Sequence, residues 1–254
     1  MAHFSELRRR LVIIAVSLLV FTIAIYFFSP YLIDFLLRPI ERFIPGGAAN
    51  GVNIFDPVGG FVLRFKVSFV GAVMVTSPIW IWQFLAFFLP ALKPNERKWV
   101  VPTFFAGVFL FIGGNVFCYY IILTPAFQWL LAQTAAFASI IADAAKYIGV
   151  ILMFELVFGF AFELPLVIFY LIVFNIVPYK KLRKSWRVVY ITLMIVCAFA
   201  TPDASPIPML LLFAAMVGLY ELSLGLARLV LRRRIARQEL EEDESLAITE
   251  SSEG

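Results

Sequence analysis

Apolar residues gather in six long runs along the chain, separated by short polar segments. Most of these runs reach the length of about 20 residues that an α-helix needs to cross a bilayer. The pattern therefore predicts an all-α protein, a polytopic membrane bundle of six transmembrane helices. We expect the spans at Leu11–Leu37, Val67–Leu89, Trp99–Leu123, Tyr147–Phe174, Val188–Thr201 and Pro206–Ala227.

Two local features qualify this pattern. Only 14 residues separate Arg187 from Pro202, a helix of about 21 Å against a hydrocarbon core of about 30 Å. We expect the bilayer to thin there, or neighbouring helices to shelter this span. Thr124 and Pro125 form a helix-start pattern. It predicts that a new hairpin or interfacial helix begins there and runs to Lys146, with its apolar side chains towards lipid.

Composition supports a membrane protein. The chain is 62% hydrophobic and 15% charged, with a mean hydropathy of +0.93, whereas soluble domains carry about 25% charged residues. We expect one transmembrane domain over residues 1–227. The remaining tail, residues 228–254, is first basic and then acidic, and we expect it to be disordered.

The positions of the basic residues predict the orientation. If both termini are cytoplasmic, 16 of the 21 lysines and arginines fall on the cytoplasmic side, as the positive-inside rule requires. The basic residues form short clusters beside apolar runs instead of one stripe, so nucleic acid is not an expected partner. We expect a multi-pass protein of the cell (inner) membrane.

Several classes of chemistry are excluded by residues that the sequence lacks. His3 is the only histidine, which argues against a catalytic histidine and against a metal site. The two cysteines, Cys118 and Cys197, lie in apolar runs, where a thiol behaves as a small hydrophobe. The chain has no P-loop motif. We therefore expect no enzyme, no cofactor and no bound metal.

Three glutamates lie inside predicted spans, where an ionisable group is costly and needs a reason. For Glu155, a packed neutral acid and a functional site are equally good interpretations. For Glu163, we favour a proton site or a polar contact with a partner helix. Glu221 lies near the cytoplasmic end of its span, and either snorkelling to the interface or pairing with Arg228 would explain it.

Two further glutamates, Glu6 and Glu96, belong to cytoplasmic segments. Taken alone, each is best explained as a carboxylate in the first turn of a helix, near the positive end of the helix dipole. The alternative is a pair of carboxylates that awaits a cationic ligand, because guanidinium and carboxylate groups pair in a bidentate manner.

Several segments of the chain, including those that contain Glu6, Glu96 and Glu163, resemble motifs of the TatC family, the polytopic subunit of the twin-arginine (Sec-independent) protein translocase. Residues 3–11, HFSELRRRL, resemble the family's opening H-x-x-E-L-R-x-R-L, and residues 83–97 resemble its first cytoplasmic loop. Residues 160–165, FAFELP, resemble its fourth-span F-x-F-E-x-P element. Thr201-Pro202 and the run 219–221 resemble its fifth-to-sixth turn and the end of its sixth span. The matches occur in order over nearly the whole chain.

The resemblance implies a receptor and core subunit that binds twin-arginine signal peptides of folded cargo. It also implies recruitment of TatA- and TatB-like single-span partners into an oligomeric complex in membrane lipid, with transport driven by the proton motive force. Glu6 and Glu96 would receive the arginine pair, and Glu163 would contact a partner's transmembrane helix. Other residues would shape the signal-peptide site, namely Phe87, Pro90, Leu92 and Arg97.

One departure affects what can be carried over. Many family members have Asp and then Gln in the fifth-to-sixth turn, but the segment around Asp203 has no Gln, so no partner contact is assigned to Asp203. Two other functions stay open. A secondary transporter would use Glu155 and Glu163 as proton sites, although no internal repeat is visible. A structural subunit would have no ligand of its own.

Overall fold

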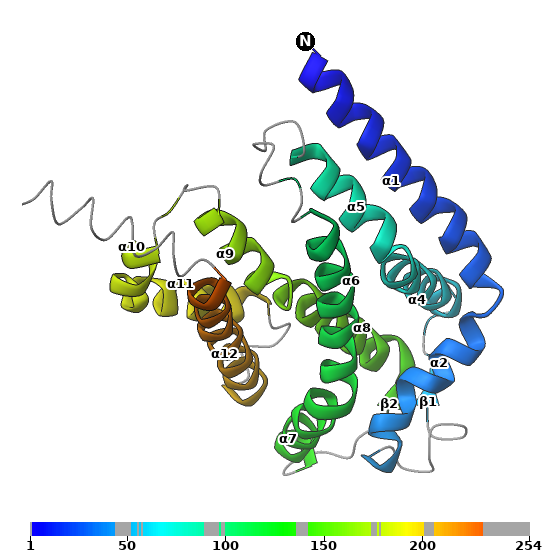
Figure 1. The fold of residues 1–254 in the computed structure, drawn as a ribbon. Coiled ribbons are helices and arrows are strands. Elements are labelled where there is room, and N and C mark those ends of the chain that lie inside the picture. The colour runs from blue at the N-terminus through cyan, green and yellow to red at the C-terminus, as the bar shows by residue number, and fades with distance from the viewer. Residues whose placement is uncertain are drawn as a thin grey trace, which may run out of the picture.

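The computed structural model describes residues 2–43, 52–54, 56, 58–88, 97, 100–135, 142–173, 177, 179–200 and 206–230. These residues are mostly helical, so the all-α prediction is confirmed at that level. The described part also holds one short parallel pair of strands, β1 (Val52–Asn53) and β2 (Ala142–Asp143). Figure 1 shows this pair at the opposite end of the molecule from the N-terminus.

The first apolar run is not one helix. Helix α1 (Ala2–Tyr26) ends at a turn, and α2 (Ser29–Leu37) follows it. Pro30 has no N–H to donate to the carbonyl of Tyr26, which accepts instead from Ser29 Oγ at 2.7 Å and from Arg64 Nη2 at 3.3 Å. The predicted span Leu11–Leu37 is therefore too long, and η1 (Arg38–Phe43), a 3₁₀ helix, completes this end.

The second apolar run is bent. Helix α4 (Gly59–Val75) begins before the predicted Val67, and α5 (Ser77–Phe88) follows at an angle of 55°. Pro78 lies in the first turn of α5, where a missing N–H does no harm. At the bend, Thr76 Oγ1 donates to the carbonyl of Ala72 at 2.7 Å.

The helix start predicted at Thr124-Pro125 is wrong. Helix α6 (Val100–Phe117), a π-helical turn η4 (Cys118–Ile122) and α7 (Leu123–Ala135) form one continuous span. The wide turn ends where Leu123 N–H donates to the carbonyl of Cys118, and Pro125 follows directly, so the chain passes the proline without a break. Phe127, expected to face lipid, is 2% exposed.

The second half begins with α8 (Ala144–Ala161), whose N-terminus is capped by Asp143. The break before α9 (Leu164–Val173) falls at Phe162 and Glu163, and Pro165 lies in the first turn of α9. Then come α10 (Tyr179–Lys184), α11 (Trp186–Ala200) and α12 (Pro206–Val230). The tail was predicted to begin at residue 228, but residues 228–230 continue α12. Residues 231–254 of that predicted disordered tail lie outside the described residues.

Four described helical stretches are long and apolar enough to cross a membrane, and the bent pair α4–α5 makes up to five. The apolar part of α11, Trp186–Phe199, is shorter, as the sequence predicted. The chain is thus a multi-pass membrane protein. Helix α8 packs against α4 and α6, and α12 packs against α9. Helix α1 lies along the outer edge against α4 and α5, and only 6% of its span is buried (Figure 1).

Candidate functional site

The carboxylate of Glu6 already holds a guanidinium. Arg10, one helical turn further along α1, donates from Nη2 to Glu6 Oε1 at 2.6 Å. The side chains of Glu6 and Arg10 are 36% and 20% exposed. A half-exposed carboxylate that binds one guanidinium in this geometry shows that the position is suited to guanidinium groups.

Arg10 also connects two helices. Its Nη1 donates to Gln83 Oε1 on α5 at 3.2 Å, while its Nε is buried and makes no hydrogen bond with any other described residue. The N-terminal part of α1 is thereby fixed beside α5, which leads into the predicted first cytoplasmic loop (Figure 1). The sequence analysis missed Arg10 and Gln83 as site residues, although both lie in the motifs it singled out.

The structure places some of the other predicted signal-peptide residues. Phe87 is half-buried near the end of α5, and Arg97 is exposed. Glu96, Pro90 and Leu92 lie outside the described residues. The described residues therefore join the α1 and α5 sides of the site, and the pairing of Glu6 with Glu96 stays a prediction.

Glu163 lies at the break between α8 and α9 and faces α6. A Cβ added to Gly107 on α6 would lie 3.5 Å from Glu163 Oε2 and 3.7 Å from Oε1. Glu163 Oε1 is buried without a hydrogen-bond partner in the described part of the chain. Such a group costs about 1–3 kcal/mol, so Glu163 lies at this break at an energetic cost.

Close helix packing holds α8 against α6. A Cβ on Gly114 would lie 2.7 Å from the carbonyl oxygen of Phe158, and a Cβ on Gly159 would lie 2.8 Å from Asn115 Nδ2. Small residues allow this approach, as is common between membrane helices. The two glycines therefore set the position of the α8 end that carries Glu163.

Glu155 is the most buried of the intramembrane acids, at 2% exposure, and its Oε1 has no hydrogen-bond partner among the described residues. This burial is compatible with both interpretations that the sequence left open.

Glu221 does not use the partner suggested by the sequence. Its carboxylate accepts from Arg183 Nη1 at 2.6 Å and from the Tyr190 hydroxyl at 2.9 Å. The hydrogen bond to Glu221 raises the pKa of Arg183 above its ordinary value. Tyr220 adds a bond from its hydroxyl to the carbonyl of Leu182 at 2.9 Å. Helix α10 is thus tied to α12.

Comparisons with known proteins agree with this architecture. The family model described as Sec-independent protein translocase protein (TatC) matches residues 2–214. The Sec-independent protein translocase protein TatC of Frankia casuarinae is 36% identical over 249 residues, covering 93% of this chain and 67% of that protein. The same-named protein of Deinococcus radiodurans is 32% identical and covers 94% of this chain and 88% of that protein.

Solved structures match as well. Two crystal structures of the twin arginine translocase receptor TatC, one of them in DDM, align with a TM-score of 0.77 at 26% identity. They cover 89% of this chain and 99% and 98% of their own chains. The fold and these relatives define a multi-pass membrane component of a protein translocase, a transport role and not an enzymatic one. The chain belongs to the TatC family.

Proposed function

We propose that this chain is the receptor and core subunit of a twin-arginine translocase, and that it binds the arginine pair of a signal peptide at Glu6. The observation that carries the proposal is the Glu6–Arg10–Gln83 connection. It sets a half-exposed carboxylate beside the helix that leads into the segment of Glu96.

The ion pair between Glu6 and Arg10 leaves one oxygen of Glu6 available to a ligand. Only Oε1 of Glu6 accepts a bond from a donor in the described residues. An incoming arginine would bind Oε2 or displace Arg10, and a second carboxylate at Glu96 would take the other arginine. Arginine is favoured over lysine because its planar fork bonds both oxygens of a carboxylate at once. Phe87, Pro90, Leu92 and Arg97 would shape the walls of this site.

The same proposal assigns Glu163 to partner recruitment. The Glu163 side chain is only partly buried, so its carboxyl group can meet a polar side chain of a TatA- or TatB-like transmembrane helix. We propose six spans in the inner membrane with both termini cytoplasmic, the short α11 being the fifth. A bundle of this size cannot enclose a pore for a folded protein. The chain would therefore act as receptor and assembly platform, with the proton motive force driving transport by the whole complex.

Export in cells tests the proposal. Glu6→Ala and Glu96→Ala are each expected to abolish export of a folded cargo with a twin-arginine signal, while the chain still accumulates in the membrane. Glu41→Ala, an exposed acid in η1, is the matched control and is expected to export normally. Normal export by both Glu6→Ala and Glu96→Ala would refute the assignment.

A further inference from the structure

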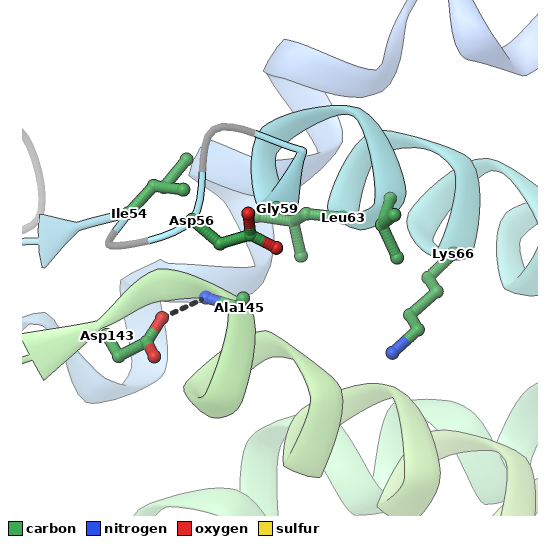
Figure 2. Close-up of a pocket in the computed structure, with 8 residues that line it drawn as sticks. Ile54, Asp56, Gly59, Leu63, Lys66, Asp143 and Ala145 are labelled. Carbon is green, nitrogen blue, oxygen red and sulfur yellow. Dashed lines mark hydrogen bonds between the residues drawn. The ribbon is translucent and has the colours of Figure 1, made fainter.

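Two adjoining cavities open between α4 and α8, at the end of the molecule away from Glu6. The smaller has a volume of about 210 Å³ and the larger about 700 Å³. Lys66, Asp143 and Ala145 line both cavities. Figure 2 shows Lys66 reaching from α4 into the space between the helices, opposite the first turn of α8.

The two cavities differ in charge. The larger is lined by Lys66 and Lys146, and Lys66 forms no ion pair with another described residue. Lys146 Nζ is 3.9 Å from Asp143 Oδ2 and its side chain is 84% exposed. The smaller cavity adds Asp56 to Asp143. Lys66 and Asp143 are common to both cavities, so the larger cavity differs by a second lysine, Lys146, and the smaller by a second carboxylate, Asp56.

Each acid is held in place by the start of a helix. Asp56 Oδ1 accepts from Val58 N–H at 3.1 Å. Asp143 Oδ1 accepts from Ala145 N–H at 3.0 Å, the bond drawn in Figure 2. Gly59 lets the loop lie close to α4, because a Cβ there would be 3.3 Å from Asp56 Cβ. One oxygen of each carboxylate is therefore occupied, and Oδ2 of Asp56 remains for a cation.

The other residues that line the larger cavity are mostly apolar, and the cavity lies in a membrane protein. Its walls come from α7 and α8, with aromatic and aliphatic side chains at Phe127, Leu130, Leu131, Tyr147 and Val150. A wall of this kind accepts hydrocarbon, and lysines at its edge take a phosphate at headgroup depth. The space is also within the range of sites that enclose small molecules.

We propose that these joined cavities bind one phospholipid with an ethanolamine headgroup, its phosphate between Lys66 and Lys146 and its ammonium against Asp56 and Asp143. An acyl chain lies along Leu130 on α7, a partly exposed residue of the cavity wall. A lipid with a glycerol headgroup brings the phosphate but no cation for the two carboxylates. The lipid would contact α4, α7 and α8 together. This inference does not depend on what binds at Glu6 on α1.

Native mass spectrometry of the purified, delipidated chain tests this inference. The chain is titrated separately with phosphatidylethanolamine and phosphatidylglycerol of the same acyl chains. We expect one ethanolamine lipid to bind at least about fivefold more tightly than the glycerol lipid, which corresponds to about 1 kcal/mol. The double variant Lys66→Gln/Lys146→Gln is expected to lose this tight binding. Lys181→Gln/Lys184→Gln, with two exposed lysines on α10, is the matched control and keeps it.

Asp56→Asn separates the headgroup preference from binding itself. Because it removes the negative charge and keeps the size, it is expected to bring the two lipids to similar affinity. Equal binding of both lipids by the unaltered chain would overturn the proposal, as would tight ethanolamine-lipid binding by a folded Lys66→Gln/Lys146→Gln variant. Displacement of the lipid by soluble glycerophosphoethanolamine at equal concentration would overturn the acyl-chain contact.

Discussion

Arg10 Nη2 lies 2.6 Å from Glu6 Oε1, so the carboxylate proposed to receive a signal arginine already binds an arginine of its own chain. The intramolecular pair keeps the Glu6 carboxylate oriented before a ligand binds. It also means that a ligand arginine must share Glu6 with Arg10 or replace it there.

Removing this internal competitor is expected to strengthen signal-peptide binding. Arg10→Gln removes a cation that repels the incoming arginine, and half-exposed ion pairs contribute about 0.2–1 kcal/mol. We expect a gain in affinity of up to about fivefold, measured by titration of a labelled twin-arginine peptide into the purified chain.

Gln83→Ala is the control for this gain, because it removes the bond to α5 without changing charge, and we expect little change in affinity. A loss of binding in Arg10→Gln would show instead that Arg10 is itself part of the peptide site.

Replacement of the neighbouring glycines Gly113 and Gly114 by alanine is expected to affect the melting temperature differently. A Cβ on Gly114 would lie 2.7 Å from the carbonyl oxygen of Phe158, whereas a Cβ on Gly113 meets nothing within 4 Å. Overpacking of this kind costs about 1–3 kcal/mol, so Gly114→Ala lowers the melting temperature in detergent. Gly113→Ala leaves it unchanged or raises it slightly. Equal melting temperatures would contradict the close α6–α8 packing.

The ion pair between α10 and α12 gives a salt-dependent prediction. Glu221→Gln loses the charge that binds Arg183 and Tyr190, so we expect a lower melting temperature at low salt. The difference should shrink at high salt, because an exposed pair is screened. A double-mutant cycle with Arg183→Gln measures the coupling between the two side chains. Once either partner is changed, changing the other should lower the melting temperature little further. Equal effects at both salt concentrations would contradict an electrostatic origin.

Substitutions at Glu163 and at Glu6 are expected to affect two different functions, partner association and signal-peptide binding. Glu163→Gln replaces the carboxyl group by an amide of the same size and should reduce co-purification of a TatB-like partner, while twin-arginine peptide binding stays unchanged. Glu41→Gln should affect neither. If Glu163→Gln weakens peptide binding as much as partner association, the two sites are not independent.

Much of the fold was predictable because span length and apolar content are set by the bilayer. The helices at Val100–Phe117 and Trp186–Ala200 begin within two residues of prediction. The breaks were harder to predict. Pro30 and Ser29 lie close to the end of α1 at Tyr26, but Arg64 on α4, which also donates to the Tyr26 carbonyl, is 38 residues away in sequence.

The candidate site shows the same division. Motif resemblance singled out Glu6 and Glu163, but not the contacts that position them. The Arg10–Gln83 bond joins residues 73 apart in sequence. Gly107 on α6 leaves space for the Glu163 carboxyl group. The sequence alone does not reveal which residue packs against a glycine within a helix. For Glu221, the sequence suggested Arg228, whereas the fold brings Arg183 to it.

The most direct test is binding of a twin-arginine signal peptide to the detergent-purified chain, compared with the same peptide carrying two lysines. Lysine keeps the charge and loses the bidentate fork. The receptor proposal predicts that the arginine peptide binds about tenfold or more tightly, a difference of about 1.4 kcal/mol or more. It also predicts that Glu6→Gln or Glu96→Gln removes the difference and that Glu41→Gln retains it. Equal binding of the two peptides, or an arginine preference that survives both substitutions, would contradict it.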